Sequence, residues 1–414
     1  MKKKRYDVVV VGCGPCGSVA GKFAALGGAE TLIVEEKRQI GFPVHDATSM
    51  IFDQSEMEEI TGEKIEPAAV YALASGIAYI SPSGVRGKPY PLSGCFINRQ
   101  LFQKSLAISA IRAGAEIALH TRAVDVARDG AKVTGIIVRN GAEVTTIQSS
   151  VVILAEGSYR RISRMAGTKF PSGPIRAALA LEYAGVKALT PMPGIDQIFM
   201  DETRQGLNQL AAPYAPDRLS IGSSFSPQPG KERKSLKLRL DHFVRHLEEI
   251  GMYDFSQASP VNMMAGGVAI MSGAGAEPLA QNGLLLAGDA AGELQFGFRA
   301  ATVGFMAGAA WNGRVVGTLA AEAVRRHDFG SALSGEYQGI LDKSVTKENR
   351  KYLNDSLSAR KETGQLSNEA QDRMIEEIGY EIGALHLAAR GALDPKLLSC
   401  LATVQQWLKE KKGR

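Results

Sequence analysis

The alternation of apolar and polar positions predicts a strand, a loop, a helix and a second strand at the start of the chain. Residues 6–11, YDVVVV, are a β-branched run typical of a strand buried in a parallel sheet. A glycine-rich loop follows at residues 12–17, and residues 18–26 have the small side chains of a closely packed helix. Residues 31–34 are apolar again and lead to Glu35. This order is that of a βαβ unit.

The later pattern predicts two further regions. A helix is expected at 99–114, and strands at 123–128, 132–138, 143–148 and 151–154, with a hairpin turn at Asn140-Gly141. From residue 166 the chain has more proline and more alternating strand segments, with an amphipathic helix at 235–250. A buried strand returns at 283–287, a small-residue helix covers about 299–325, and the chain after 330 is predominantly helical.

These elements predict an α/β fold. Residues 1–165 and 266–330 are expected to form a discontinuous Rossmann-type domain. Residues 166–265 are expected to form an inserted antiparallel-sheet domain that holds the substrate, and residues 331–414 a helical C-terminal region.

Composition and charge exclude several classes of protein. The 414 residues are 45% hydrophobic and 22% charged, the balance of a soluble globular protein. A net charge of +5 is too small over this length to predict nucleic-acid binding. No apolar run reaches the roughly 18 residues that span a bilayer, and no secretory signal opens the chain. We therefore expect a cytoplasmic protein, whose basic residues 2–5 would suit contact with an anionic membrane surface.

The cysteines and histidines do not predict a metal site. Cys13 and Cys16 form a C-x-x-C, but both lie inside the glycine loop and no second pair completes a zinc or iron–sulfur site. His242 and His246 are spaced i, i+4 without a third ligand. We expect no metal.

The loop Gly12-Cys13-Gly14-Pro15-Cys16-Gly17 has the spacing of a dinucleotide-binding turn. Gly12 permits a tight turn, Gly14 lets a diphosphate approach the backbone, and Gly17 lets helix and strand pack closely. Pro15 and Cys16 are further candidate contacts in this loop, beside the helix N-terminus that attracts phosphate. Glu35 is placed to accept hydrogen bonds from an adenosine ribose; its neighbour Glu36 is a second candidate, although on a strand it should point the other way.

A second glycine turn distinguishes FAD from NAD. The buried strand at 283–287 runs into Gly288-Asp289-Ala-Ala-Gly292, which resembles the second FAD motif of glutathione-reductase-type flavoproteins. The resemblance implies that Asp289 binds the ribityl hydroxyls. Glu156-Gly157-Ser158 resembles the D-G-x-x-S element of that family, with Glu in place of Asp. Arg99 resembles the arginine that contacts FAD, and Val124 and Gly297 are further FAD contacts that the resemblance implies. The expected cofactor is FAD.

A narrower resemblance covers nearly the whole chain. The stretch Glu35–Val44, the segment Asn98–Phe102 followed by Ala-Gly-Ala at 113–115, and the tail segments 366–372 and 394–398 resemble the geranylgeranyl reductase family. The resemblance implies reduction of isolated C=C bonds in a hydrophobic prenyl or quinone substrate. No second G-x-G-x-x-G is present for a bound nicotinamide. The electron donor is therefore expected to be external, NAD(P)H or a ferredoxin-like protein.

Three departures from the family pattern fall on the substrate side. Asp46 stands where the family commonly has a cysteine, and the Y-x-W-x-F-P signature is replaced by residues 206–213, which keep only the proline. The P-x-x-G-x-G after the second FAD motif is replaced by Phe296-Gly297-Phe298-Arg299, which is more like the quinone-reducing electron-transfer flavoprotein oxidoreductases.

Reduction of an unactivated alkene needs a proton on one carbon as hydride reaches the other. We hypothesise that His45 or Asp46 supplies or relays this proton; a surface histidine and a helix-capping aspartate are the alternative. Arg299 would stabilise negative charge on the reduced flavin.

Two other functions fit the same fold. An aromatic hydroxylase would consume oxygen with its substrate, whereas a halogenase needs a tryptophan-rich W-x-W-x-I-P wall and only Trp311 and Trp407 are present. An electron carrier to quinone would need an iron–sulfur partner, because this chain has no cysteine set for one.

Overall fold

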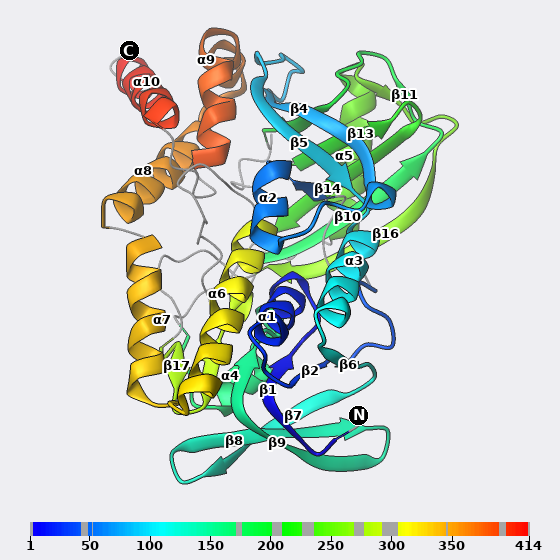
Figure 1. Cartoon of the computed structure of the whole chain (residues 1–414). Coiled ribbons are helices and arrows are strands. Elements are labelled where there is room, and N and C mark those ends of the chain that lie inside the picture. Colours follow the sequence, from blue (N-terminus) through cyan, green and yellow to red (C-terminus); the bar gives the residue numbers. More distant parts are fainter. Residues whose placement is uncertain are drawn as a thin grey trace.

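The computed structural model describes residues 3–42, 49–51, 53–170, 176–200, 209–225, 236–268, 277–291, 305–344, 347–388 and 395–412. The chain forms two large sheets with helices around them, and the two termini lie at opposite ends of the molecule (Figure 1).

The first sheet contains the βαβ unit that the sequence predicts. Its parallel part has the order β18-β9-β1-β2-β6, with β17 at one end and the β7–β8 hairpin joined to β9. The strands are β1 (Arg5–Val11), β2 (Thr31–Val34), β6 (Glu116–Ala118), β7 (Arg122–Asp129), β8 (Lys132–Asn140), β9 (Glu143–Leu154), β17 (Ala280–Gln281) and β18 (Leu284–Leu286).

Two strands that the sequence separates are one in the structure. The predicted strands 143–148 and 151–154 form the single strand β9. Its first half pairs antiparallel with β8, and its second half pairs parallel with β1. Each half therefore has a different partner, and this is why the sequence pattern changes in the middle. The hairpin turn at Asn140-Gly141 is confirmed, with Gly141 at φ +60°.

Helices cover one face of this sheet, and α1 and α6 lie side by side on it (Figure 1). They are α1 (Pro15–Leu26), α2 (Gln54–Thr61), α3 (Arg99–Arg112), α6 (Phe305–Arg326) and α7 (Ser331–Ser344). Their apolar side chains form one core with strand residues such as Val10, Ile33 and Ile153. The opposite face packs against the β7–β8 hairpin and the short helix α4 (Arg161–Met165).

The second sheet draws strands from two distant parts of the chain. Its order is β16-β10-β14-β13-β12-β4-β5-β3. The strands are β3 (Ser49–Ile51), β4 (Val70–Ile80), β5 (Tyr90–Ile97), β10 (Arg176–Ala184), β12 (Ile195–Phe199), β13 (Gln209–Ala215), β14 (Arg218–Phe225) and β16 (Ser259–Val268); β11 (Lys187–Ala188) and β15 (Tyr253–Asp254) form a separate pair. Residues 49–97, which the sequence analysis assigned to the Rossmann-type domain, thus contribute three strands here. Only the tertiary structure shows this, because the alternation of apolar and polar residues identifies a strand but not the strand with which it pairs.

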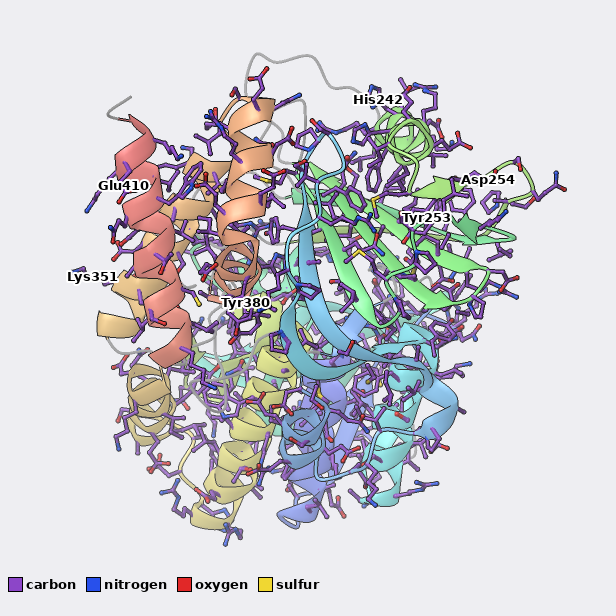
Figure 2. All side chains as sticks on the ribbon, turned by 90° about the horizontal axis from the view of Figure 1, so that it is seen from above. His242, Tyr253, Asp254, Lys351, Tyr380 and Glu410 are labelled. Atoms are coloured by element: carbon purple, nitrogen blue, oxygen red, sulfur yellow. The ribbon has the colours of Figure 1, made fainter. Side chains whose placement is uncertain are left out.

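Both faces of the second sheet are covered. Helix α5 (Leu236–Glu249) packs on one face through Leu240, Phe243 and Leu247. The C-terminal helices α8 (Lys347–Thr363), α9 (Asn368–Ala388) and α10 (Pro395–Lys412) form a core with the other face. Figure 2 shows Tyr380 of α9 beside the strands, where its ring lies 5.0 Å from that of Tyr90.

Two helix glycines, one at the contact between α1 and α6 and one in open space, should respond oppositely to substitution by alanine. A Cβ on Gly317 of α6 would lie 2.3 Å from the carbonyl oxygen of Ala20, whereas a Cβ on Gly339 of α7 would meet nothing within 4 Å. We expect Gly317→Ala to lower the free energy of unfolding by about 1–3 kcal/mol through overpacking. Gly339→Ala should raise it by up to about 1 kcal/mol, because alanine favours helix. Urea unfolding measures both, and a stable Gly317→Ala variant would contradict the close packing.

Candidate functional site

Five parallel strands end in register along one edge of the first sheet. The pairs are Val34 with Ala118, Val11 with Val34, Val11 with Leu154, and Leu286 with Leu154. The segments that leave these strands are the glycine loop at 12–17, Glu35, Glu156-Gly157 and Gly288-Asp289. Candidate residues far apart in the sequence therefore meet at one edge, the position where open α/β sheets bind ligands.

The glycine loop leaves room for a phosphate. Gly12 has φ +100°, and a Cβ there would lie 2.5 Å from the carbonyl oxygen of Ala155. A Cβ on Gly17 would lie 1.9 Å from the carbonyl oxygen of Gly12, so helix α1 reaches the strand only through glycine. A Cβ on Gly14 would meet nothing within 4 Å, so open space lies in front of this residue.

The N-terminus of α1 faces this edge without a competing cap. The helix starts at Pro15, and Gly14 before it provides no side-chain hydrogen bond to the first amides. No acidic side chain lies in the first turn. The amide N–H groups and the positive end of the helix dipole are thus suited to hold a diphosphate.

Glu35 is buried and faces the loop. One carboxylate oxygen accepts a hydrogen bond from the Cys13 amide at 2.8 Å, and the other accepts one from the Lys37 amide at 3.0 Å. An ionised carboxylate has about four acceptor positions, so two remain for ribose hydroxyls. Glu36 is exposed, and its Oε2 lies 3.6 Å from Nε of Arg122. Of the two candidates, Glu35 is the one that contacts the glycine loop.

Arg99 begins helix α3 close to the Glu35 segment. Asn98 caps the helix, its Oδ1 accepting from the Leu101 amide at 3.0 Å. Burial lowers the pKa of Lys37, and the charge of Arg99 lowers it further against the opposing effect of Glu35 and Glu36. A Cβ on Gly41 would lie 3.0 Å from Cα of Gln100, so the start of α3 packs on the segment that follows Glu35.

Val124 is a bulge residue. In the ladder between β7 and β8, Ala123 pairs with Val138 and Asp125 pairs with Ile137, so Val124 has no partner in register. A bulge frees backbone groups from the ladder, and these are the groups an adenine base could bind. The carbonyl of Ala123 is held at 2.6 Å by Nη2 of Arg161.

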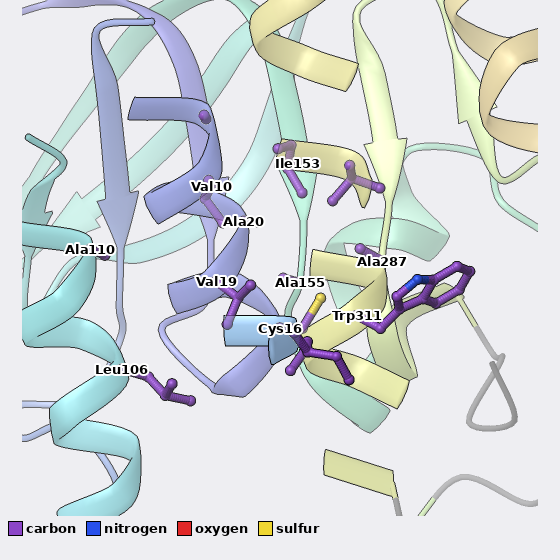
Figure 3. Close-up of a cluster of buried hydrophobic side chains, with 14 of the residues drawn as sticks. Val10, Cys16, Val19, Ala20, Leu106, Ala110, Ile153, Ala155, Ala287 and Trp311 are labelled. Carbon is purple, nitrogen blue, oxygen red and sulfur yellow. The ribbon is translucent and has the colours of Figure 1, made fainter. Parts of the chain in front are cut away.

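The second glycine turn packs directly on α1. Gly288 has φ +62°, and a Cβ there would lie 3.0 Å from Cβ of Cys16. Asp289 directly follows Gly288, so the same approach brings it to the first turn of α1. Burial raises the pKa of Cys16, and the negative charge of Asp289 raises it further. Figure 3 shows Cys16 near Ala155, Ala287 and Trp311 in this core. Gly157, at φ +72°, has open space around its Cβ position.

Asn312, which no sequence pattern singled out, holds this turn. The Gly288 amide donates to Oδ1 of Asn312 on α6 at 2.7 Å. The Asn312 amide group in turn donates to the hydroxyl of Tyr337 at 2.9 Å, and that hydroxyl donates to the carbonyl of Leu286 at 2.7 Å. A single asparagine in a helix rich in glycine and alanine was the available signal.

Five predicted residues lie outside the described residues: His45, Asp46, Gly292, Gly297 and Arg299. Their roles stay predictions. Among the residues that the structure describes, no three His, Cys, Asp or Glu side chains gather in a way that could hold a metal ion. No helix in the described ranges is long and apolar enough to cross a bilayer.

Comparison with known proteins agrees with this geometry. Residues 7–217 match the family model described as FAD dependent oxidoreductase. A digeranylgeranylglycerophospholipid reductase of Methanocaldococcus jannaschii is 30% identical over 385 residues, which cover 92% of this chain and 93% of that protein. The chain belongs to the FAD-dependent oxidoreductase family. Such relatives place it in the geranylgeranyl reductase group, and FAD is its cofactor.

Other relatives of this FAD-dependent oxidoreductase include a digeranylgeranylglycerophospholipid reductase of Methanosphaera stadtmanae, 27% identical over 85% of this chain and 86% of that one. A solved geranylgeranyl bacteriochlorophyll reductase-like protein of Thermoplasma acidophilum has a TM-score of 0.78 at 21% identity, covering 99% of both chains. A flavin-dependent brominase has a TM-score of 0.66 at 18% identity, covering 99% of both chains. At these identities the two structures confirm the fold alone.

The FAD site of this oxidoreductase predicts a strong dependence on Glu35. We expect Glu35→Ala to raise the Kd for FAD by about 10- to 100-fold, because loop and ribose both lose a charged acceptor. Glu30→Ala is the matched control, since Glu30 precedes the opposite end of β2 and forms an exposed ion pair with Lys3. Titration of the apoprotein by flavin fluorescence measures both; equal Kd values would remove Glu35 from the site.

The buried thiols predict a loss of stability at alkaline pH. Burial raises the pKa of Cys13 to about 12 and that of Cys95 to about 11. An unfolded thiol ionises near pH 8.5, so the stabilisation is complete below that pH and is lost as the pH rises towards the folded pKa values. We expect the urea midpoint to fall between about pH 8.5 and 11. A variant with Cys13→Ala and Cys95→Ala should show a smaller fall; an identical fall would show that these thiols do not contribute.

Proposed function

We propose that this chain reduces C=C bonds of an isoprenoid lipid chain by hydride transfer from FAD. The observation that carries the proposal is the extent of the match to the Methanocaldococcus jannaschii protein, whose name is digeranylgeranylglycerophospholipid reductase. The match covers 92% of this chain, so it includes the second sheet and the C-terminal helices as well as the FAD edge.

The bound FAD would, once reduced, supply the hydride. The α1 N-terminus would hold the diphosphate, Glu35 the ribose and Asp289 the ribityl chain. His45 or Asp46 would donate the proton to the second alkene carbon. Arg299 would stabilise the negative charge of reduced flavin. An unchanged flavin reduction potential in Arg299→Ala would exclude that role.

We extend the proposal to an external electron donor and to contact with a membrane surface. NAD(P)H or a ferredoxin-like protein would reduce the flavin from outside, because the sequence has no second dinucleotide-binding loop. The basic N-terminal residues would bring a cytoplasmic protein to an anionic membrane surface that holds the lipid. Flotation with anionic vesicles tests this contact, and recovery of all the protein in the unbound fraction would contradict it.

The described side chains speak against a halogenase wall and against an iron–sulfur cluster within this chain. Trp311 and Trp407, the only tryptophans, are both buried in helix packing, and Trp407 donates to Glu377 at 2.6 Å. They do not form a halogenase wall. Cys400 lies in the core of the C-terminal helices, apart from the core that contains Cys13, Cys16 and Cys95. The cysteines therefore do not gather to hold an iron–sulfur cluster.

Stopped-flow reoxidation tests the proposal. The protein is reduced anaerobically with dithionite and mixed separately with digeranylgeranylglycerophospholipid, menaquinone or an aromatic acid. We expect the prenyl lipid to reoxidise the flavin and to gain two hydrogen atoms per reduced bond, measured by mass spectrometry. Reoxidation by menaquinone or the aromatic acid alone would overturn the proposal.

The same assay tests the proton donor. Asp46→Asn should slow reoxidation by the lipid about 100-fold or more, because an amide cannot supply the proton. Reduction by dithionite and the Kd for FAD should stay unchanged. Equal reoxidation rates in variant and parent would remove Asp46 from the mechanism.

A further inference from the structure

Arg160 lies between two of the segments that surround the FAD edge. It follows the turn η2 (Gly157–Tyr159) and directly precedes α4. Its Nε donates a hydrogen bond to the carbonyl oxygen of Asp289 at 2.9 Å. The residue is 8% exposed, so the guanidinium is buried at the junction of the two turns.

The backbone of Arg160 adopts a conformation that glycine would occupy at lower cost. Its φ and ψ are +51° and +34°, in the left-handed region. Residues with a Cβ are uncommon there, and such strain concentrates at functional sites. An arginine at this position suggests that its side chain has a role that offsets the strain.

The guanidinium is fixed in place but incompletely hydrogen-bonded. It stacks on the ring of Phe170 at 4.8 Å, and its Nη2 is buried with no hydrogen-bond partner among the described residues. A buried donor without a partner is costly, and a guanidinium stays charged in proteins. An anion with acceptor oxygens is the ligand that would satisfy it.

The diphosphate of FAD is the anion expected at this junction. Gly288 packs on Cys16 in the first turn of α1, where the diphosphate is expected. Asp289 directly follows Gly288, and its carbonyl oxygen accepts the hydrogen bond from Arg160 Nε at 2.9 Å, so Arg160 lies beside this turn. We propose that Arg160 is a further FAD-binding residue: Nη2 donates to the diphosphate while Nε holds the turn that carries Asp289. The proposal rests on FAD as cofactor and not on the identity of the substrate.

Arg160→Gly gives the sharpest test, because it removes the guanidinium and relieves the strained backbone. We expect the apoprotein to stay folded by circular dichroism and the Kd for FAD to rise by about 10- to 100-fold. The affinity for ADP, measured by competition with FAD, should fall by the same factor, because ADP keeps the diphosphate and lacks the flavin. Arg160→Lys should lie between parent and glycine variant, since lysine keeps the charge but not the planar fork.

Arg164→Ala is the matched control. Arg164 also stacks on Phe170, at 5.6 Å, but it is exposed, and among the described hydrogen bonds its side chain donates only to the carbonyl oxygen of Tyr159, at 3.2 Å. Its substitution should change both affinities by less than about 2-fold. An unchanged Kd for FAD in Arg160→Gly would overturn the proposal. A weaker FAD affinity with unchanged ADP affinity would also overturn it, because Arg160 would then act only through the Asp289 turn. None of these titrations uses a prenyl lipid, so their failure is distinguishable from failure of the proposed reaction.

Discussion

The close approach of helix α1 to strand β1 and to helix α6 is the constraint on which the FAD site depends. The backbone of α1 meets Gly12 on one side, and Gly313 and Gly317 of α6 on the other, at distances where a Cβ would overlap backbone atoms. This packing places the N-terminus of α1 at the carboxyl edge of the sheet. It also sets the second glycine turn against Cys16, so that two parts of the chain 272 residues apart form one binding edge.

Around this edge the structure uses hydrogen bonds to hold each turn from a neighbouring element. Glu35 holds the first loop through the Cys13 amide, and Asn312 holds the second turn through the Gly288 amide. The Glu156 carboxylate accepts from the Ile162 amide at 2.9 Å and from the Ser163 amide at 2.6 Å. These bonds hold the start of α4 against the turn that contains Gly157. Each turn is therefore positioned before any cofactor binds, which lowers the entropic cost of binding.

Helices pack on both faces of the second sheet. One face packs on α5, and the other forms a core with the C-terminal helices, where His386 of α9 lies 2.9 Å from the hydroxyl of Tyr79 on β4. The fold is shared with a flavin-dependent brominase at 18% identity, so the architecture alone does not select a reaction. The relationship to a prenyl-lipid reductase over 92% of this chain favours alkene reduction.

The sequence by itself determined the local elements and the cofactor. The glycine spacing at 12–17, the acid after β2 and the Gly288-Asp289 turn are short-range patterns, because each residue acts on its own backbone or on the next element. Only the tertiary structure decided which strands pair. It joined 143–148 and 151–154 into β9 and brought residues 70–97 into the second sheet. It also decided between Glu35 and Glu36 as the acid that faces the loop, and it revealed Asn312 and Arg160 at the second turn. Contacts between separate elements, from 22 residues apart for Cys13 and Glu35 to 129 for Arg160 and Asp289, depend on packing and burial, and a single sequence does not encode them in any local pattern.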